Sequence, residues 1–205
     1  MNALEPKRAS FNHSHLPKQK ILYQPMKEMH LENMRHRYNE ICPPLFKDTD
    51  PKRLPQDKLS QVLAYEHKPK GKGLVLAGDT GQGKTRAAWI LINRLLCEEG
   101  VPVRFLSDPM FSIEYSKRLG NGTADEWMDA LCRVAVLFID DFGKAAITPR
   151  YKEQFYTIIN ERCNHYRPTI LTTQWSKSKL IERFGDDDGK AIARRILEFS
   201  EIVKF

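Results

Sequence analysis

A glycine-rich octapeptide at residues 78–85, Gly-Asp-Thr-Gly-Gln-Gly-Lys-Thr, has the spacing G-x-x-x-x-G-K-[ST] of a phosphate-binding loop. The glycines let the backbone turn tightly, so that several N–H groups point at a phosphate. Lys84 supplies a cation for the terminal phosphates, and the Thr85 hydroxyl can bind Mg²⁺. The pattern predicts that ATP and Mg²⁺ bind here, with nucleotide contacts from Gly78, Asp79, Thr80, Gly81, Gln82, Gly83, Lys84 and Thr85.

The flanking residues support this prediction. Residues 73–77 form a short apolar run, as a buried strand would. Apolar residues recur at helical spacing through residues 87–96. A strand, a loop and a helix in this order place the phosphate at a helix N-terminus, where free N–H groups and the helix dipole favour anions. The alternative, a glycine-rich loop with a chance lysine, does not account for these flanks.

Two carboxylates end a second apolar run, Ala-Val-Leu-Phe-Ile-Asp-Asp at residues 135–141. Carboxylates at the end of a buried strand are costly unless they face a cation or a reactant. We expect Asp140 to hold Mg²⁺ together with Thr85. We expect Asp141 to polarise the water that attacks the terminal phosphate. The alternative is that the two acids only cap the following turn.

The charge of the chain is concentrated near its N-terminus. The net charge is +7, and residues 1–72 hold 14 Lys and Arg against 8 Asp and Glu. A basic segment suits an anionic partner such as nucleic acid, although a solvated tail would have the same composition. No apolar run is long enough to cross a bilayer, and residues 1–8 do not resemble a signal peptide. The composition therefore predicts a cytoplasmic protein without membrane association.

The cysteines and histidines do not predict a metal site. Four cysteines are scattered along the chain without a C-x-x-C pair, which is typical of reduced thiols in a cytosolic protein. The pairs His13 with His15 and His30 with His36 could bind a metal, but no cluster of thiolates or carboxylates accompanies them.

The sequence divides into two regions. Residues 1–55 are expected to be a basic extension that binds a partner, and residues 56–205 a domain that binds ATP. In the extension, Leu31, Met34, Tyr38 and Ile41 share one face of a helix predicted over residues 25–41, which Pro43 and Pro44 would end. This face can dock on a partner or pack onto its own domain, and we slightly favour the partner.

Strands and helices alternate after residue 72. Apolar runs at 73–77, 103–106, 134–139, 169–172 and 201–205 are separated by helical segments near 84–98, 109–119, 124–132, 149–165, 176–184 and 189–198. The alternation predicts a three-layer α/β fold with a five-stranded, mainly parallel sheet. Ligands bind such folds at the carboxyl ends of the strands, where the phosphate-binding loop would lie.

Four segments together resemble a known family. Residues 73–85, 136–143, 168–174 and 193–196 are similar, in order and spacing, to the helicase-loader and transposition-helper branch of the AAA+ ATPases, typified by DnaC and IstB. The resemblance covers residues 73–205 and implies a P-loop AAA+ ATPase domain. Most AAA+ proteins continue into a helical lid, and we expect this lid to be absent or vestigial here.

The resemblance also implies roles for single residues. Gln174 stands where the family usually has the Asn called sensor 1, which orients the attacking water, and Thr173 is the alternative. Arg195 aligns with the arginine finger, which reaches the active site of a neighbouring subunit in a spiral or ring. Arg194 and Arg162 are weaker candidates for the finger.

A DNA-binding role is implied for the segment between the second and third strands. In the family this region lines a channel for DNA, so Lys117 and Arg118 could bind phosphates, and Phe111 or Tyr115 could stack on bases. The alternative is an ordinary amphipathic helix with Phe111, Ile113 or Tyr115 in the core.

These implications favour an ATP-dependent helicase loader. It would bind a replicative DNA helicase, expected to be hexameric, and single-stranded DNA during replication initiation, with weak and assembly-dependent ATP hydrolysis. The second candidate function is a transposition helper that binds DNA and a transposase. The third is an ATP-gated adaptor without hydrolysis, and a small-molecule kinase is a distant fourth.

Overall fold

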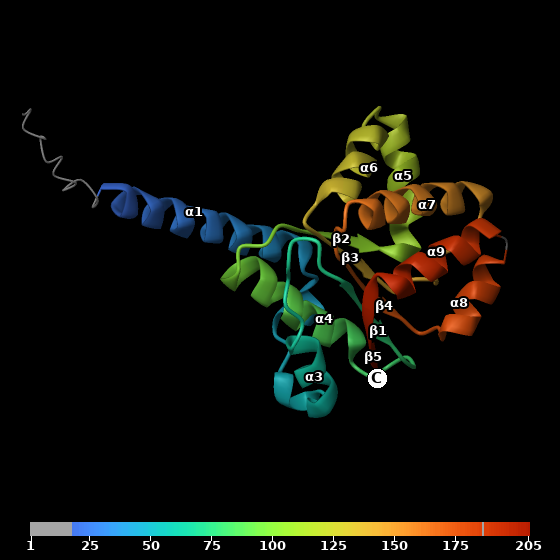
Figure 1. Cartoon of the computed structure of the whole chain (residues 1–205), viewed down its shortest axis with the longest axis horizontal. Coiled ribbons are helices and arrows are strands. Elements are labelled where there is room, and N and C mark those ends of the chain that lie inside the picture. The colour runs from blue at the N-terminus through green and yellow to red at the C-terminus, as the bar shows by residue number, and fades with distance from the viewer. Residues whose placement is uncertain (1–17, 186) are drawn as a thin grey trace, which may run out of the picture.

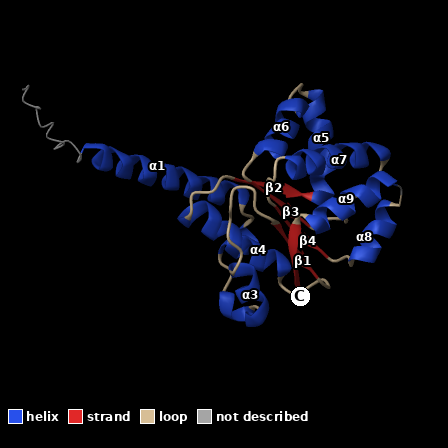
Figure 2. Ribbon diagram, in the orientation of Figure 1, coloured by secondary structure: helices blue, strands red, loops and turns tan. Residues whose placement is uncertain are grey.

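The computed structural model describes residues 18–185 and 187–205, which form a five-stranded sheet covered by helices on both faces (Figures 1 and 2). The strands are β1 (Gly73–Ala77), β2 (Val103–Ser107), β3 (Val136–Asp140), β4 (Thr169–Thr173) and β5 (Ser200–Lys204). Their order in the sheet is β2-β3-β4-β1-β5, and every neighbouring pair is parallel. The predicted α/β fold is confirmed, and each strand lies within two residues of its expected position.

The helices follow the predicted alternation. They are α1 (Lys18–Ile41), α2 (Pro44–Lys47), α3 (Gln56–Leu63), α4 (Lys84–Asn93), α5 (Phe111–Gly120), α6 (Ala124–Arg133), α7 (Pro149–Asn164), α8 (Lys177–Phe184) and α9 (Asp187–Glu198). A π turn (Arg94–Glu98) continues α4, and short 3₁₀ turns lie at Pro51–Arg53 and Asp108–Met110. No helix among the described residues is both long enough and apolar enough to span a membrane. The absence of a lid stays a prediction.

Side chains of the central strands alternate between two cores. On β3, Val136 and Phe138 belong to the core under α1, α3 and α4, whereas Leu137 and Ile139 belong to the core under α5 to α9. Successive side chains of a strand point to opposite faces, and both faces of this sheet are covered. This is why the strands read as continuous apolar runs in the sequence.

Helix α1 differs from the expectation in length and in packing. It begins at Lys18 and not at residue 25, so that Pro25 lies inside it, and its first turns project from the domain (Figure 1). The predicted stripe packs onto the protein's own domain, because Tyr38 is buried there and its ring meets Trp89 edge-on at 6.1 Å. The stripe therefore packs on its own domain and not on a partner, which the sequence slightly favoured.

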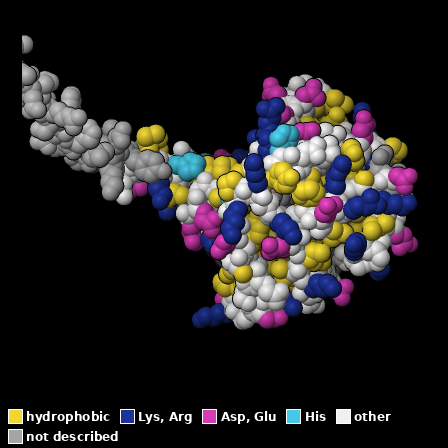
Figure 3. All heavy atoms as spheres, viewed as in Figure 1, with side chains coloured by type: hydrophobic (Ala, Val, Ile, Leu, Met, Phe, Trp, Pro, Cys, Tyr) yellow, Lys and Arg dark blue, Asp and Glu magenta, His cyan; other side chains and the backbone are white. Residues whose placement is uncertain are grey.

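The projecting part of α1 includes a solvent-exposed stretch. Residues 24–30 are all exposed, and Met26 and Met29 have 65% and 62% of their surface accessible. The first 17 residues, including His13 and His15, lie outside the described part of the chain. On the face shown in Figure 3, Lys and Arg side chains are interspersed with Asp and Glu. The domain boundary at residue 55 stays a prediction.

Candidate functional site

The phosphate-binding loop joins the carboxyl end of β1 to the N-terminus of α4. Gly81 and Gly83 have φ angles of +88° and +90°, in the left-handed region that disfavours other residues. A Cβ atom on Gly83 would also lie 2.7 Å from the Leu54 side chain. The loop therefore requires glycine at these positions, and it ends where the backbone N–H groups of α4 are free to bind an anion.

Lys84 lies inside this loop. It is the first residue of α4, it is buried, and its Nζ donates a hydrogen bond to the Asp79 carbonyl oxygen at 2.6 Å. Burial is the main cause that lowers the pKa of Lys84 from its usual value. Since a phosphate would supply charged acceptors for this ammonium, the loop fits the terminal phosphates of a nucleotide.

Asp140 and Thr85 come together as predicted for a magnesium site. The Thr85 hydroxyl donates to Asp140 Oδ1 at 2.9 Å, and the Thr172 hydroxyl donates to the same oxygen at 2.5 Å. Burial raises the pKa of Asp140, and these two hydrogen bonds oppose the rise. A carboxylate beside a hydroxyl offers the oxygen ligands that Mg²⁺ prefers. Thr85 and Asp140 therefore fit the ion.

Asp141 lies next to Asp140 in an unusual backbone conformation. Its φ angle is +60°, and its N–H donates to the Thr172 hydroxyl oxygen at 2.9 Å. Its carboxylate forms an ion pair with Lys144, whose Nζ is 2.7 Å from Oδ1. Asp141 lines the same cleft as the phosphate-binding loop, which is where a group that polarises water must lie.

Gln174 reaches the loop despite its extra methylene. Its Oε1 accepts a hydrogen bond from the Thr80 hydroxyl at 3.0 Å. Thr173, the alternative sensor, is buried, and its hydroxyl donates to the Phe142 carbonyl at 2.8 Å. The alternative role for Thr173 is therefore wrong in this structure.

One cleft of about 790 Å³ is lined by residues 80–86 of the phosphate-binding loop and α4 and by Asp141 and Gln174. Its volume is within the range of small-molecule sites. Part of its wall is residues 45–55, which sequence reasoning did not place at the site. Arg86 Nη1 holds this segment by donating to the Leu45 carbonyl at 3.1 Å and the Thr49 hydroxyl at 3.2 Å. No motif marks the segment in the sequence.

Asp108 is a second residue that sequence reasoning missed. It follows β2, is completely buried, and accepts hydrogen bonds from the N–H groups of Gly143 and Ala145 at 2.9 and 3.1 Å and from the Tyr151 hydroxyl. It thereby holds the loop after Asp141. A carboxylate two residues after an expected strand was the available signal.

The three candidate finger arginines lie in different surroundings. Arg195 is half-buried on α9, with its guanidinium 5.1 Å from the centre of the Tyr156 ring, and Arg194 beside it is exposed. Neither lines the cleft of its own subunit. The assignment of Arg195 as the finger stays a prediction.

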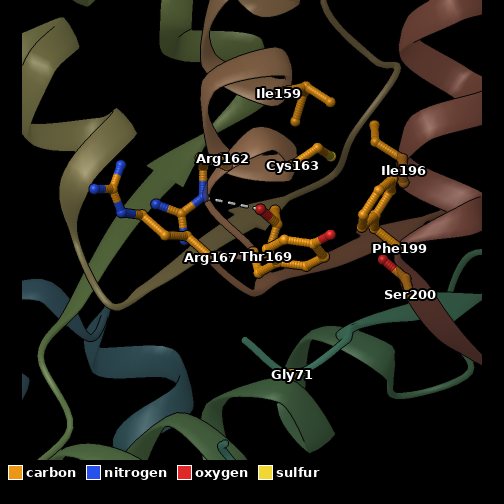
Figure 4. Close-up of a pocket in the computed structure, with 10 residues that line it drawn as sticks. Gly71, Ile159, Arg162, Cys163, Arg167, Thr169, Ile196, Phe199 and Ser200 are labelled. Atoms are coloured by element: carbon orange, nitrogen blue, oxygen red, sulfur yellow. Dashed lines mark hydrogen bonds between the residues drawn. The ribbon is translucent and has the colours of Figure 1, made fainter. Parts of the chain in front are cut away.

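Arg162 is a structural residue, and its candidacy as a finger is wrong. It is completely buried, and it donates to the carbonyl oxygens of Leu131 and Val134 at 2.8 and 2.9 Å. Figure 4 shows its hydrogen bond to Thr169 Oγ1, at 3.0 Å. Burial is the main cause that lowers its pKa to about 9. The adjacent cavity of about 20 Å³ has room for a single water molecule.

The expected DNA-binding residues lie on α5, away from the cleft lining. Lys117 is exposed, whereas Arg118 is 3.7 Å from Glu114 and lies over the Trp127 ring at 5.1 Å. Phe111 is completely buried in the core, so its proposed stacking on bases is wrong. Tyr115 is half-buried.

Replacing Thr172 by Val should test how Asp140 is positioned. Valine keeps the shape of the side chain but loses both hydrogen bonds of the hydroxyl, so we expect Mg²⁺-dependent ATP turnover to fall about 10- to 100-fold. Nucleotide affinity without Mg²⁺ should stay nearly unchanged. Both are measured by phosphate release and calorimetry, with Thr157→Val, on the exposed face of α7, as the control. Full turnover in Thr172→Val would contradict the role.

Comparisons with known proteins agree with this geometry. A family model described as IstB-like ATP binding protein matches residues 45–205. The replicative helicase loader DnaI of Bacillus subtilis is 28% identical over 139 residues, which are 66% of this chain and 44% of that protein. The ATP-binding protein of insertion sequence IS1162 from Pseudomonas fluorescens is 32% identical over 105 residues, 51% of this chain and 45% of that protein.

The fold agrees as well. The crystal structure of DnaI superposes with a TM-score of 0.65 and 23% identity, covering 80% of this chain and 94% of that one. The chain spans less than half the length of the two curated relatives. Because the family model covers well over half of the chain, the chain belongs to the IstB-like ATP binding protein family, with a AAA+ P-loop fold.

Proposed function

We propose that the protein is an ATP-dependent helicase loader, acting in the cytoplasm, that binds a replicative DNA helicase and single-stranded DNA during replication initiation. The observation that carries the ATPase part is the hydrogen-bonded group of Thr85, Asp140 and Thr172 beside Asp141. It supports metal-dependent hydrolysis because Thr85, which is hydrogen-bonded to Asp140, and Asp141 both line the cleft of the phosphate-binding loop.

Each residue has a distinct role in this proposal. The loop N–H groups and Lys84 bind the phosphates, and Thr85 with Asp140 holds Mg²⁺, which neutralises charge on the β- and γ-phosphates when bound. Asp141 accepts a hydrogen bond from the attacking water, and Gln174 orients it from the end of β4. Arg195 completes the site of a neighbouring subunit, so turnover is slow in isolated subunits.

The partner is proposed from the relatives and from α1. DnaI is named a replicative helicase loader and matches a longer part of this chain than the insertion-sequence protein does. The exposed Met26 and Met29 on the projecting part of α1 suit an apolar contact, since methionine adapts to irregular surfaces. The insertion-sequence relative keeps a transposition helper as the second candidate.

The partner can be tested with the full chain as bait and purified proteins as prey. We expect capture of a hexameric replicative helicase, and about a tenfold loss of affinity in the variant Met26→Ser, Met29→Ser, because burial of two methionines is removed. Met110→Ser, an exposed methionine before α5 and outside the cleft lining, is the control. Binding of a transposase in place of the helicase would favour the second candidate. Absence of ATP turnover in the wild type would favour the adaptor.

The finger can be tested by mixing two inactive variants. Asp141→Asn lacks the acid but keeps the finger, and Arg195→Ala lacks the finger but keeps the acid. If Arg195 acts on a neighbour, the mixture should recover part of the wild-type turnover, and the wild-type rate per subunit should rise with protein concentration. Arg194→Ala serves as the matched control on the same helix. Full activity of isolated Arg195→Ala would contradict the role.

The DNA contact can be tested by the salt dependence of binding. If Lys117 and Arg118 each bind a phosphate of single-stranded DNA, the double alanine variant should reduce the slope of log affinity against log salt by about 1.4. Fluorescence anisotropy with a labelled oligonucleotide measures this slope. The variant Lys68→Ala, Lys72→Ala changes the net charge equally on another part of the surface. Equal slopes for the wild type and Lys117→Ala, Arg118→Ala would count against the assignment.

A further inference from the structure

A second lysine lies in the nucleotide cleft and has no role in the proposal above. Lys144 lines the cleft together with Lys84, Asp141 and Gln174. Its ammonium pairs with Asp141 at 2.7 Å, and both side chains remain partly exposed, by 33% and 40%. Lys84 lines this cleft from the phosphate-binding loop, and Lys144 lines it from the turn after β3. The two lysines therefore face the same cleft.

The backbone on both sides of Lys144 is fixed from one direction by Asp108. This buried carboxylate accepts hydrogen bonds from the N–H groups of Gly143 and Ala145, at 2.9 and 3.1 Å, and from the Tyr151 hydroxyl. The N–H of Lys144 itself donates to the Asp141 carbonyl at 3.1 Å, which closes a turn.

The same two residues are held from the other direction by α8 and the end of β4. Trp175 Nε1 donates to the Gly143 carbonyl at 3.1 Å, and Arg183 donates to it through Nε. Arg183 Nη2 also donates to the Ala145 carbonyl at 3.0 Å. The N–H and carbonyl groups of both flanking residues thus have partners, so the Cα of Lys144 is held in place. Its side chain pairs with Asp141 and is partly exposed. Such an arrangement is typical of a binding residue.

We propose that Lys144 binds the terminal phosphate of ATP and thereby distinguishes ATP from ADP. This inference rests on the proposed ATP-binding function. The pair that Lys144 forms with Asp141 is partly exposed and joins single charges, so it is weak. A terminal phosphate carries more negative charge and more acceptor oxygens than one carboxylate, and competes for the ammonium.

The movement of Lys144 from Asp141 to the phosphate would also free Asp141 to polarise the attacking water. While Asp141 is paired with Lys144, one of its carboxylate oxygens is occupied. When Lys144 turns to the phosphate, that oxygen can accept a hydrogen bond from the attacking water. Lys144 thus links the presence of the third phosphate to the availability of Asp141. ADP lacks that phosphate and leaves the pair intact.

Nucleotide binding by the variant Lys144→Met tests the inference without reference to turnover. Isothermal titration calorimetry with Mg²⁺ should show binding of a non-hydrolysable ATP analogue weakened about tenfold and binding of ADP changed by less than about twofold. Lys144→Arg should retain most of the discrimination. Lys190→Met is the matched control, because Lys190 also pairs with an Asp three residues earlier, at 3.3 Å, and does not line the cleft.

The outcomes separate this inference from the proposed function. Suppose that the wild type binds both nucleotides and that Lys144→Met weakens the binding of both equally, or of neither. The inference about Lys144 is then overturned, and the proposed ATP binding stands. If the wild type binds neither nucleotide, both fail. In the Asp141→Asn variant, Lys144 no longer has its ion pair. Adding Lys144→Met to that variant should therefore reduce the affinity for the ATP analogue by a larger factor than in the wild type. A smaller factor would contradict the proposed transfer of Lys144 from Asp141 to the phosphate.

Discussion

The Asp140 carboxylate is the interaction on which the site depends, because it joins three segments that are distant in sequence. One oxygen accepts from Thr85 at the start of α4 and from Thr172 near the end of β4. The Thr172 hydroxyl also accepts the N–H of Asp141 and so supports its left-handed backbone. Parallel strands bring these ends to one edge, and a shift of β4 would displace both acids together.

The parts of this site that the sequence predicts are those encoded over a few adjacent residues. The phosphate-binding loop and the pair Asp140 and Asp141 each follow an apolar strand, and parallel pairing brings them together. Gln174 was placed through the family resemblance, and it does reach the loop. Its one-methylene difference from the usual Asn is absorbed because Thr80 supplies the hydrogen bond.

The parts that the sequence does not predict depend on long-range hydrogen bonds. Asp108 meets Gly143, 35 residues away, and nothing in its local sequence indicates that partner. Arg162 resembles a surface arginine at the end of a helix, but the carbonyl groups that surround it make it the anchor between α6 and β4. The stripe on α1 predicts a buried face. Whether that face packs on its own domain or on a partner depends on the difference between the free energies of the two contacts, and the spacing of apolar residues does not give that difference.

The position of residues 45–55 gives the cleft a physical connection to α1. Arg86, next to Thr85, holds the carbonyl of Leu45 and lies over the ring of Phe46. Phe46 stacks on Trp89. The Trp89 ring also meets the ring of Tyr38, near the C-terminal end of α1. A nucleotide that contacts residues 45–55 would touch a segment that packs, through Trp89, against Tyr38 of α1. If it favours one orientation of α1, a partner bound to that orientation must strengthen nucleotide binding by the same factor, since the coupling is reciprocal.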